Sequence, residues 1–243
     1  MRYVMVVEYD GTDYSGWQRQ DNAPSVQQTI EDKLSVFLQK KTVIVASGRT
    51  DKGVHAYGQV AHFDTDSKIP PANMRYAVNT MLPHDIRIVD MYETDADFHA
   101  QYSAKRKTYV YKTYVSRVLS PMRARHYAQI IPEVNVELMR EAAKCLVGEH
   151  DFRAFCSTGS SIQNKVRELY RVDINVHGDE IIFEIEGNGF LYNMVRIIVG
   201  TLVFIGRGML PVDTTQKMLD TGIRKLGGKT YPACGLALKS VKY

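Results

Sequence analysis

Apolar residues recur along the chain at two different spacings, one typical of helices and one typical of strands. Val26, Ile30 and Leu34 share one helical face behind a Ser25–Gln28 capping box, which predicts a helix. RYVMVVEY (2–9) and KTYVYKTYV (107–115) are rich in β-branched and aromatic residues and predict strands. Elements of both kinds alternate over the whole length.

The remaining elements follow the same two patterns. A further helix is predicted from just after Pro71 to Met81. Others are predicted from a cap at Asn135 to Leu146, over 191–205 and over 213–225. Further strands are predicted at 42–46, 59–64, 86–93, 166–176, 180–190 and 234–241, with a hairpin turn at 177–179.

Adjacent strands with helices interspersed favour an α+β fold with a largely antiparallel sheet over a doubly wound parallel fold. The charge pattern changes near Ser103, so we expect an N-terminal half at 1–103 and a C-terminal half at 104–243.

Composition places the chain among soluble globular proteins, with 44% hydrophobic and 24% charged residues in 243. The longest apolar run, residues 197–206, is too short to cross a bilayer, and Glu8 and Asp10 interrupt any secretory signal at the start. The three cysteines are far apart, which argues against disulfides and a zinc cluster and favours a reducing, cytoplasmic location.

Charge is unevenly distributed, although the net value is only +4. The 35 residues from 98 to 132 contain no carboxylate but hold seven cations, with tyrosines between them: Lys105, Arg106, Lys107, Lys112, Arg117, Arg123 and Arg125. Cations that neutralise phosphates and rings that stack on bases suit a site for RNA. A basic edge strand that discourages aggregation would show the same pattern.

Three residues raise questions that local patterns leave open. Asp51, in SGRTDKGVHA (47–56), fits a connecting turn as well as it fits catalysis. Arg196 is the sole charge in an apolar helix, so it needs a carboxylate partner unless it reaches the surface. Trp17, the only tryptophan, lies in a polar loop, where packing on a neighbour is its ordinary role.

Six segments together resemble the tRNA pseudouridine synthase A family, in order and nearly end to end. They are YDGTDYSGWQRQ, SGRTDKGVHAYGQVAHF, DFHAQYSAKRKTYVY, GEHDFRAF, NGFLYNMVRIIVGTL and PACGLALKSVKY. The resemblance implies the pseudouridine synthase fold, with two similar α/β-sandwich halves around a central cleft. It also implies isomerisation of uridine at positions 38, 39 and 40 of the tRNA anticodon stem-loop, without cofactor or metal, by a homodimer whose two subunits both contact tRNA.

The resemblance also assigns roles to residues. Asp51 matches the essential aspartate, Arg196 is expected to pair with it, and Tyr109 is expected to stack on the target uracil and assist the final proton removal. Arg49 would help flip the uridine out of its stack. The candidates for phosphate contacts are Lys52, Lys105, Arg106 and Lys107.

Neighbouring residues complete this picture. Tyr111 is expected in the core, and Leu191 and Met194 are expected to form an apolar wall beside Arg196. Gln101 and Thr108 stand where the family commonly has basic residues, which puts some RNA contacts in doubt.

Two other functions remain open on the residues alone. The chain could be a non-catalytic RNA-binding module on the same scaffold, which the intact set of Asp51, Tyr109 and Arg196 weighs against. Metal-dependent hydrolysis of a nucleoside bond would need a cluster of ligands, and the seven scattered histidines show no such spacing.

Overall fold

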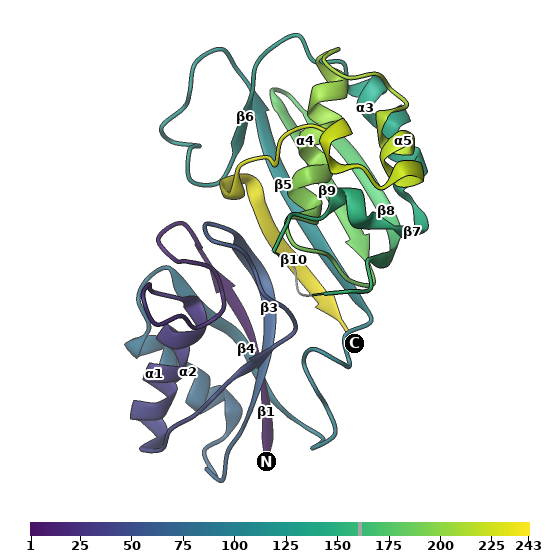
Figure 1. The fold of residues 1–243 in the computed structure, drawn as a ribbon. Coiled ribbons are helices and arrows are strands. Elements are labelled where there is room, and N and C mark those ends of the chain that lie inside the picture. Colours follow the sequence, from purple (N-terminus) through teal and green to yellow (C-terminus); the bar gives the residue numbers. More distant parts are fainter. Residues whose placement is uncertain (160–161) are drawn as a thin grey trace. The chain divides into compact units, whose positions relative to one another are not determined.

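The computed structural model describes residues 1–159 and 162–243 and divides into two compact units (Figure 1). Unit 1 comprises residues 1–105 together with 237–243, and unit 2 comprises residues 106–236. The expected division at Ser103 had placed all residues after 103 in one half, whereas the last seven residues belong to unit 1.

Unit 1 is a mainly antiparallel sheet with two helices. Its strands are β1 (Arg2–Tyr9), β2 (Val45–Ala46), β3 (His55–Asp64), β4 (Ile86–Thr94) and β10 (Leu236–Lys242), whose residues from Ala237 on lie in this unit. The order is β4-β1-β3-β10, with β2 on β3; β10 runs parallel to β3 and the other pairs are antiparallel. Helices α1 (Val26–Leu38) and α2 (Pro71–Met81) lie together on one face of the sheet (Figure 1).

The predicted signals of both helices in unit 1 are confirmed. The Ser25 side chain accepts a hydrogen bond from the Gln28 N–H at 3.3 Å and begins α1, and Pro71 occupies the first turn of α2. The strand expected at 42–46 is shorter, because the Ile44 N–H donates to the buried carboxylate of Glu31 at 3.0 Å instead of to a neighbouring strand.

Unit 2 likewise has mainly antiparallel strands, with three helices against them. Its strands are β5 (Arg106–Val115), β6 (Ala128–Ile130), β7 (Gly148–Asp151), β8 (Val166–His177) and β9 (Glu180–Gly187). The order is β5-β9-β8-β7, with β6 parallel to β5. The helices are α3 (Val136–Ala143), α4 (Met194–Gly206) and α5 (Thr214–Thr221).

Short 3₁₀ turns complete unit 2, at Lys144–Leu146, Phe152–Phe155, Arg224–Leu226 and Ala233–Gly235. The Asn135 side chain caps α3 as predicted, and Gly178 turns the predicted hairpin with a φ of 62°. The last helix is shorter than expected, since Gly222 ends it in the left-handed conformation.

Burial explains the apolar composition of helix α4. Of its 13 residues, 11 are buried between the sheet and the neighbouring helices. The chain is therefore α+β with mainly antiparallel strand pairing, as the pattern predicted. Among the described residues, no helix combines the length and the apolar character needed to span a bilayer.

Candidate functional site

The loop that carries Asp51 connects β2 to β3 in unit 1. The Val54 N–H donates to the Asp51 carbonyl at 3.1 Å, and Gly53 has a φ of 75°, so the backbone here is a tight turn. Asp51 is half-buried, while Arg49 and Lys52 on either side are exposed. Turn geometry and a partly shielded carboxylate therefore coexist at Asp51.

This loop is fastened to the loop after β1. The Trp17 N–H donates to the Thr50 carbonyl at 3.1 Å, and the Gly53 N–H donates to the Tyr14 carbonyl at 3.3 Å. The hydroxyls of Tyr9 and Thr50 lie 2.8 Å apart in a buried hydrogen bond. These bonds flank Asp51 on both sides, so its backbone position is set by the fold.

Trp17 packs inside unit 1, as expected for a lone tryptophan. It is 1% exposed, and its ring lies 5.9 Å from that of Tyr9. Burial raises the pKa of the Tyr9 phenol, which keeps that hydroxyl neutral beside Thr50. Trp17 thus supports the Asp51 loop by packing on Tyr9, which is bonded to Thr50.

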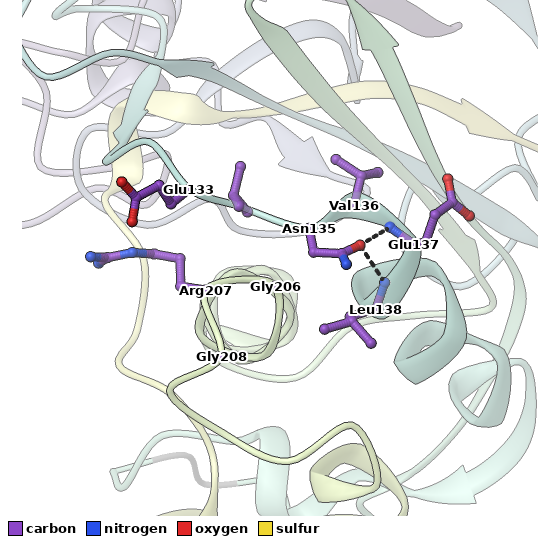
Figure 2. A pocket seen from close by; sticks show the side chains of 9 residues that line it. Glu133, Asn135, Val136, Glu137, Leu138, Gly206, Arg207 and Gly208 are labelled. Atoms are coloured by element: carbon purple, nitrogen blue, oxygen red, sulfur yellow. Dashed lines mark hydrogen bonds between the residues drawn. The ribbon is translucent and has the colours of Figure 1, made fainter.

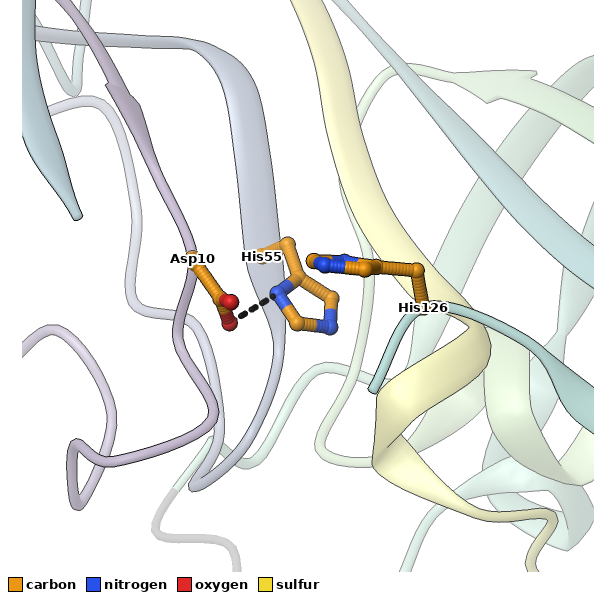
Figure 3. A group of neighbouring side chains, drawn as sticks. All are labelled: Asp10, His55 and His126. Carbon is orange, nitrogen blue, oxygen red and sulfur yellow. Dashed lines mark ion pairs between the residues drawn. The ribbon is translucent and has the colours of Figure 1, made fainter. Parts of the chain in front are cut away.

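The start of β3 is fixed in the same way. Figure 3 shows the His55 ring directed at Asp10, with Nδ1 and Oδ1 separated by 3.1 Å. The Gly11 N–H points at the same ring nitrogen from 3.0 Å. These contacts hold the strand that follows the Asp51 turn against the end of β1.

Arg196 lies in the first turn of α4 in unit 2 and is half-buried. Its Nε donates to the Tyr231 carbonyl at 2.8 Å, and its Nη1 donates to Asn193 Oδ1 at 2.7 Å. Leu191 and Met194, 4% and 1% exposed, form the apolar wall expected beside it. Because two different nitrogens are held, the plane of the guanidinium is fixed within this unit.

Asn193 was not foreseen as a site residue. Its backbone is left-handed, with a φ of 61°, and its Nδ2 donates to Ser157 Oγ at 2.9 Å. A polar residue at the start of the predicted helix was the one available signal, but the helix was expected to begin at Leu191.

Tyr109 is half-buried on β5, and its ring meets that of Phe190 edge to face at 5.0 Å. Tyr111, two residues along, is 0% exposed and donates its hydroxyl to the Pro232 carbonyl. Burial raises the pKa of the Tyr111 phenol well above its usual range. Tyr111 is therefore a core residue, as expected.

The candidate phosphate contacts differ in their surroundings. Lys105 is exposed, whereas Arg106 pairs with Glu186 at 3.1 Å and lies over the Tyr170 ring at 4.3 Å. Burial lowers the pKa of Lys107 to about 8, and the charge of Arg167 adds to this shift. Alternation along β5 places Lys107 on the face of Tyr109 and Arg106 on the other.

Some cations of the segment 98–132, which contains no carboxylate, form ion pairs with carboxylates outside it. Arg123 pairs with Asp179 at 2.6 Å, and Arg117 pairs with Glu133 at 3.4 Å. Part of the positive charge of this segment is thus neutralised by carboxylates of unit 2 that lie outside it.

Unit 1 brings together Asp51, Arg49 and Lys52, and unit 2 brings together Tyr109, Lys107 and Phe190 near one end of its sheet. The expected pair of Asp51 with Arg196 joins one unit to the other and stays a prediction.

A hollow of about 640 Å³ in unit 2 lies away from these residues (Figure 2). It is lined by residues 133–138 and 206–208, and Asn135 Oδ1 accepts from the backbone of Glu137 and Leu138 there. The Asn135 side chain serves the helix cap, and none of the candidate site residues lines this hollow.

Comparison with known proteins assigns the family. A family profile described as tRNA pseudouridine synthase matches residues 5–103 and 142–243. The chain is 47% identical over 240 residues to tRNA pseudouridine synthase A of Ruminiclostridium cellulolyticum, covering 98% of both chains. It is 45% identical over 244 residues to the protein of that name from Acetivibrio thermocellus, covering 100% of both.

A solved Cbf5-Nop10-Gar1 complex contains a chain with a weaker likeness. It is 14% identical, with a TM-score of 0.41, over 84% of this chain and 45% of that one. The assignment rests on the full-length relatives and the profile instead, and by them the chain belongs to the tRNA pseudouridine synthase A family of isomerases.

Proposed function

We propose that the protein isomerises uridine to pseudouridine at positions 38, 39 and 40 in the anticodon stem-loop of tRNA, with Asp51 as the catalytic carboxylate. One observation carries the assignment of the site: the Asp51 turn is tied on both sides to buried groups of its own unit. A carboxylate that must meet a sugar carbon accurately needs such fixed support.

The reaction requires three events at one nucleotide. The bond from the base nitrogen to the ribose breaks, the uracil rotates while still held, and a carbon–carbon bond forms to the same sugar. Asp51 either attacks the anomeric carbon or removes the 2′ proton to give a glycal, and both routes need the ionised form. The geometry is compatible with both.

Arg196 is proposed to favour that ionised form by its positive charge. Its bonds to Tyr231 and Asn193 support this role, because a guanidinium that is already oriented loses little freedom when it meets a carboxylate. Leu191 and Met194 keep its surroundings apolar, which strengthens the attraction.

The remaining roles concern the RNA. Tyr109 is proposed to stack on the target uracil and to assist the final proton removal, and Arg49, exposed beside Asp51, to hold or displace the flipped nucleotide. Lys52, Lys105 and Lys107 are proposed phosphate contacts. Arg106 is a weaker candidate, because its guanidinium is already engaged by Glu186. The homodimer and the absence of a cofactor enter the proposal from the family resemblance, and the cytoplasmic location from the three separated cysteines.

Release of tritium from tRNA that carries 5-tritiated uridine tests the proposal, because isomerisation replaces the hydrogen at that carbon. Asp51→Asn is expected to abolish release while tRNA binding survives. Asp66→Asn serves as the control, since Asp66 is an exposed aspartate of the same unit that pairs with the exposed Lys40. Undiminished release by Asp51→Asn would refute the catalytic assignment.

The two alternatives give different products in the same assay. A non-catalytic RNA-binding module would bind tRNA and release no tritium from any substrate. A metal-dependent hydrolase would produce free uracil and would stop in the presence of a chelator. Pseudouridine in the tRNA, located by chemical mapping, excludes both.

A further inference from the structure

Arg167 on β8 is a half-buried cation that has no carboxylate partner among the residues that the structure describes. Its Nη1 donates to the carbonyls of Asn164 and Val166, at 3.1 and 2.5 Å. Within residues 1–159 and 162–243 no carboxylate oxygen lies within 4.0 Å of its guanidinium. Arg171 on the same strand differs, since it pairs with both Asp173 and Glu184.

This arrangement costs free energy in the absence of a ligand. Burial lowers the pKa of the Arg167 guanidinium, which is the direction expected when a charge loses water without gaining a counter-ion. Carbonyl oxygens satisfy hydrogens but do not neutralise the charge. A partly buried arginine of this kind is suited to bind an anion that the folded protein itself does not supply.

Two lysines surround Arg167. Lys107 pairs with Gly187 across β5 and β9, and Gly187 pairs with Leu169 across β9 and β8, so these three positions share one face of the sheet. Arg167 precedes Leu169 by two residues and therefore lies on that face as well. Lys165, two residues before Arg167, places its Nζ 3.7 Å from the Cys156 sulfur.

The same face carries Tyr109. It follows Lys107 by two residues on β5, and its ring contacts Phe190. The segment after β9 links the ring to the arginine, because a Cβ added at Gly187 would lie 3.5 Å from Phe190 and one at Gly189 would lie 3.5 Å from Arg167 Nε. β5, β9 and β8 lie side by side in this order (Figure 1).

We propose that Arg167, together with Lys107 and Lys165, forms a binding site for a phosphate of the tRNA backbone next to the nucleotide that stacks on Tyr109. The inference rests on the proposed function for the identity of the RNA, and it adds Arg167 and Lys165 to the residues that bind it. A phosphodiester accepts two parallel hydrogen bonds from a guanidinium and supplies a negative charge to Arg167.

The test is the salt dependence of tRNA binding by Arg167→Gln. Each lost phosphate contact lowers the slope of log Kd against log salt by about 0.7 to 0.9. We expect that change, with a three- to tenfold weaker Kd at low salt. Arg171→Gln is the matched control and should leave the slope unchanged. It removes the same charge from the opposite face of the strand, because the β-bulge between Leu169 and Arg171 reverses the alternation.

Thermal unfolding of the free protein separates binding from structure. Arg167→Gln removes a charge that is partly buried and unneutralised, so its Tm is expected to equal or exceed that of the wild type. An Arg167→Gln protein with the wild-type salt slope, or one whose weaker binding accompanies a lower Tm, would overturn the inference. A wild type that releases no tritium would refute the proposed function. The salt dependence of tRNA binding could still be interpreted in that case, because binding is measured without turnover.

Discussion

The direction of the Arg196 guanidinium depends on one asparagine in an uncommon backbone conformation. Asn193 accepts from Arg196 Nη1 at 2.7 Å and donates to Ser157 Oγ at 2.9 Å, while its φ is 61°. Asparagine tolerates this region better than most residues, and glycine occupies it with no steric cost. What asparagine adds over glycine at this position is therefore its side chain, which bonds to Arg196 and Ser157.

Replacing Asn193 by glycine should separate the two contributions. Asn193→Gly removes the hydrogen bond to Arg196 but relieves the backbone, so we expect a loss of kcat of about tenfold, the size of one charge-assisted hydrogen bond. The Kd for tRNA and the Tm should change little. Single-turnover tritium release, tRNA binding and thermal unfolding measure the three quantities.

Glu133→Gly is the matched control for this prediction. Glu133 also has a positive φ, 72°, and its side chain pairs with the exposed Arg117. That variant should keep the wild-type kcat. Wild-type turnover by Asn193→Gly would show that the hydrogen bond from Arg196 to Asn193 is not needed to orient the guanidinium.

Single residues were predictable where their partner lies close in sequence. The caps at Ser25 and Asn135 follow from local spacing, and both hydrogen bonds are present. The Tyr231 carbonyl that holds Arg196 is 35 residues away, and no pattern around Arg196 points to it. The need for a partner could be predicted from the sequence, but the identity of this acceptor could not.

At the scale of elements, the Asp51 loop depends on the close approach of a second loop. Gly16 has a φ of 92°, and a Cβ placed there would lie 2.5 Å from the Thr50 carbonyl oxygen. Only glycine allows this contact, because an added methyl group would overlap the backbone next to Asp51. Gly16 and the Trp17 N–H bond together bring the two loops into register.

Gly16→Ala is therefore expected to affect both stability and turnover. The strained φ and the overlap should lower the free energy of unfolding by about 2 kcal/mol or more, and displacement of the Asp51 backbone should lower kcat by about tenfold or more. Urea unfolding and tritium release measure the two effects.

Gly208→Ala isolates the contribution of φ. Gly208 also has a positive φ, 68°, but a Cβ there has no atom within 4 Å. It should lose stability by only about 1 kcal/mol and keep its turnover. Equal losses in both variants would mean that the contact with Thr50 is unimportant.

Element types followed from apolar periodicity, and element ends did not. The predicted strand at 42–46 keeps only Val45 and Ala46, since the buried Glu31 carboxylate captures the Ile44 N–H. The predicted helix over 213–225 ends at Gly222. In both places a single side chain or glycine overrides the local propensity.

At the scale of the whole molecule, unit 1 is discontinuous in sequence. The chain leaves it after Lys105 and returns at Ala237 to add β10 beside β3. Ala237 pairs with His55 and Leu238 with Ala56, just after the Asp51 turn. No local pattern shows which strand a C-terminal segment will join, so the expected division near Ser103 could not include this return.

The last residue of the chain fastens β10 to the rest of unit 1. The Tyr243 ring lies 4.7 Å from that of Phe98, and its hydroxyl donates to the Ala100 carbonyl at 2.8 Å. Tyr243→Ala should lower the free energy of unfolding by about 1 to 3 kcal/mol, from the lost ring contact and the lost hydrogen bond. Urea unfolding measures it, with Tyr76→Ala as a control, because Tyr76 belongs to the same unit and is 75% exposed.

The same variant tests whether the C-terminus supports the catalytic turn. If β10 braces the start of β3, Tyr243→Ala should speed amide hydrogen exchange at His55 and Ala56 and lower kcat, although Tyr243 lies far from Asp51 in sequence. A loss of stability with unchanged exchange at these two amides would limit the role of β10 to holding unit 1 together. Faster exchange with reduced turnover would instead mean that Asp51 is positioned only once the final strand has joined the sheet.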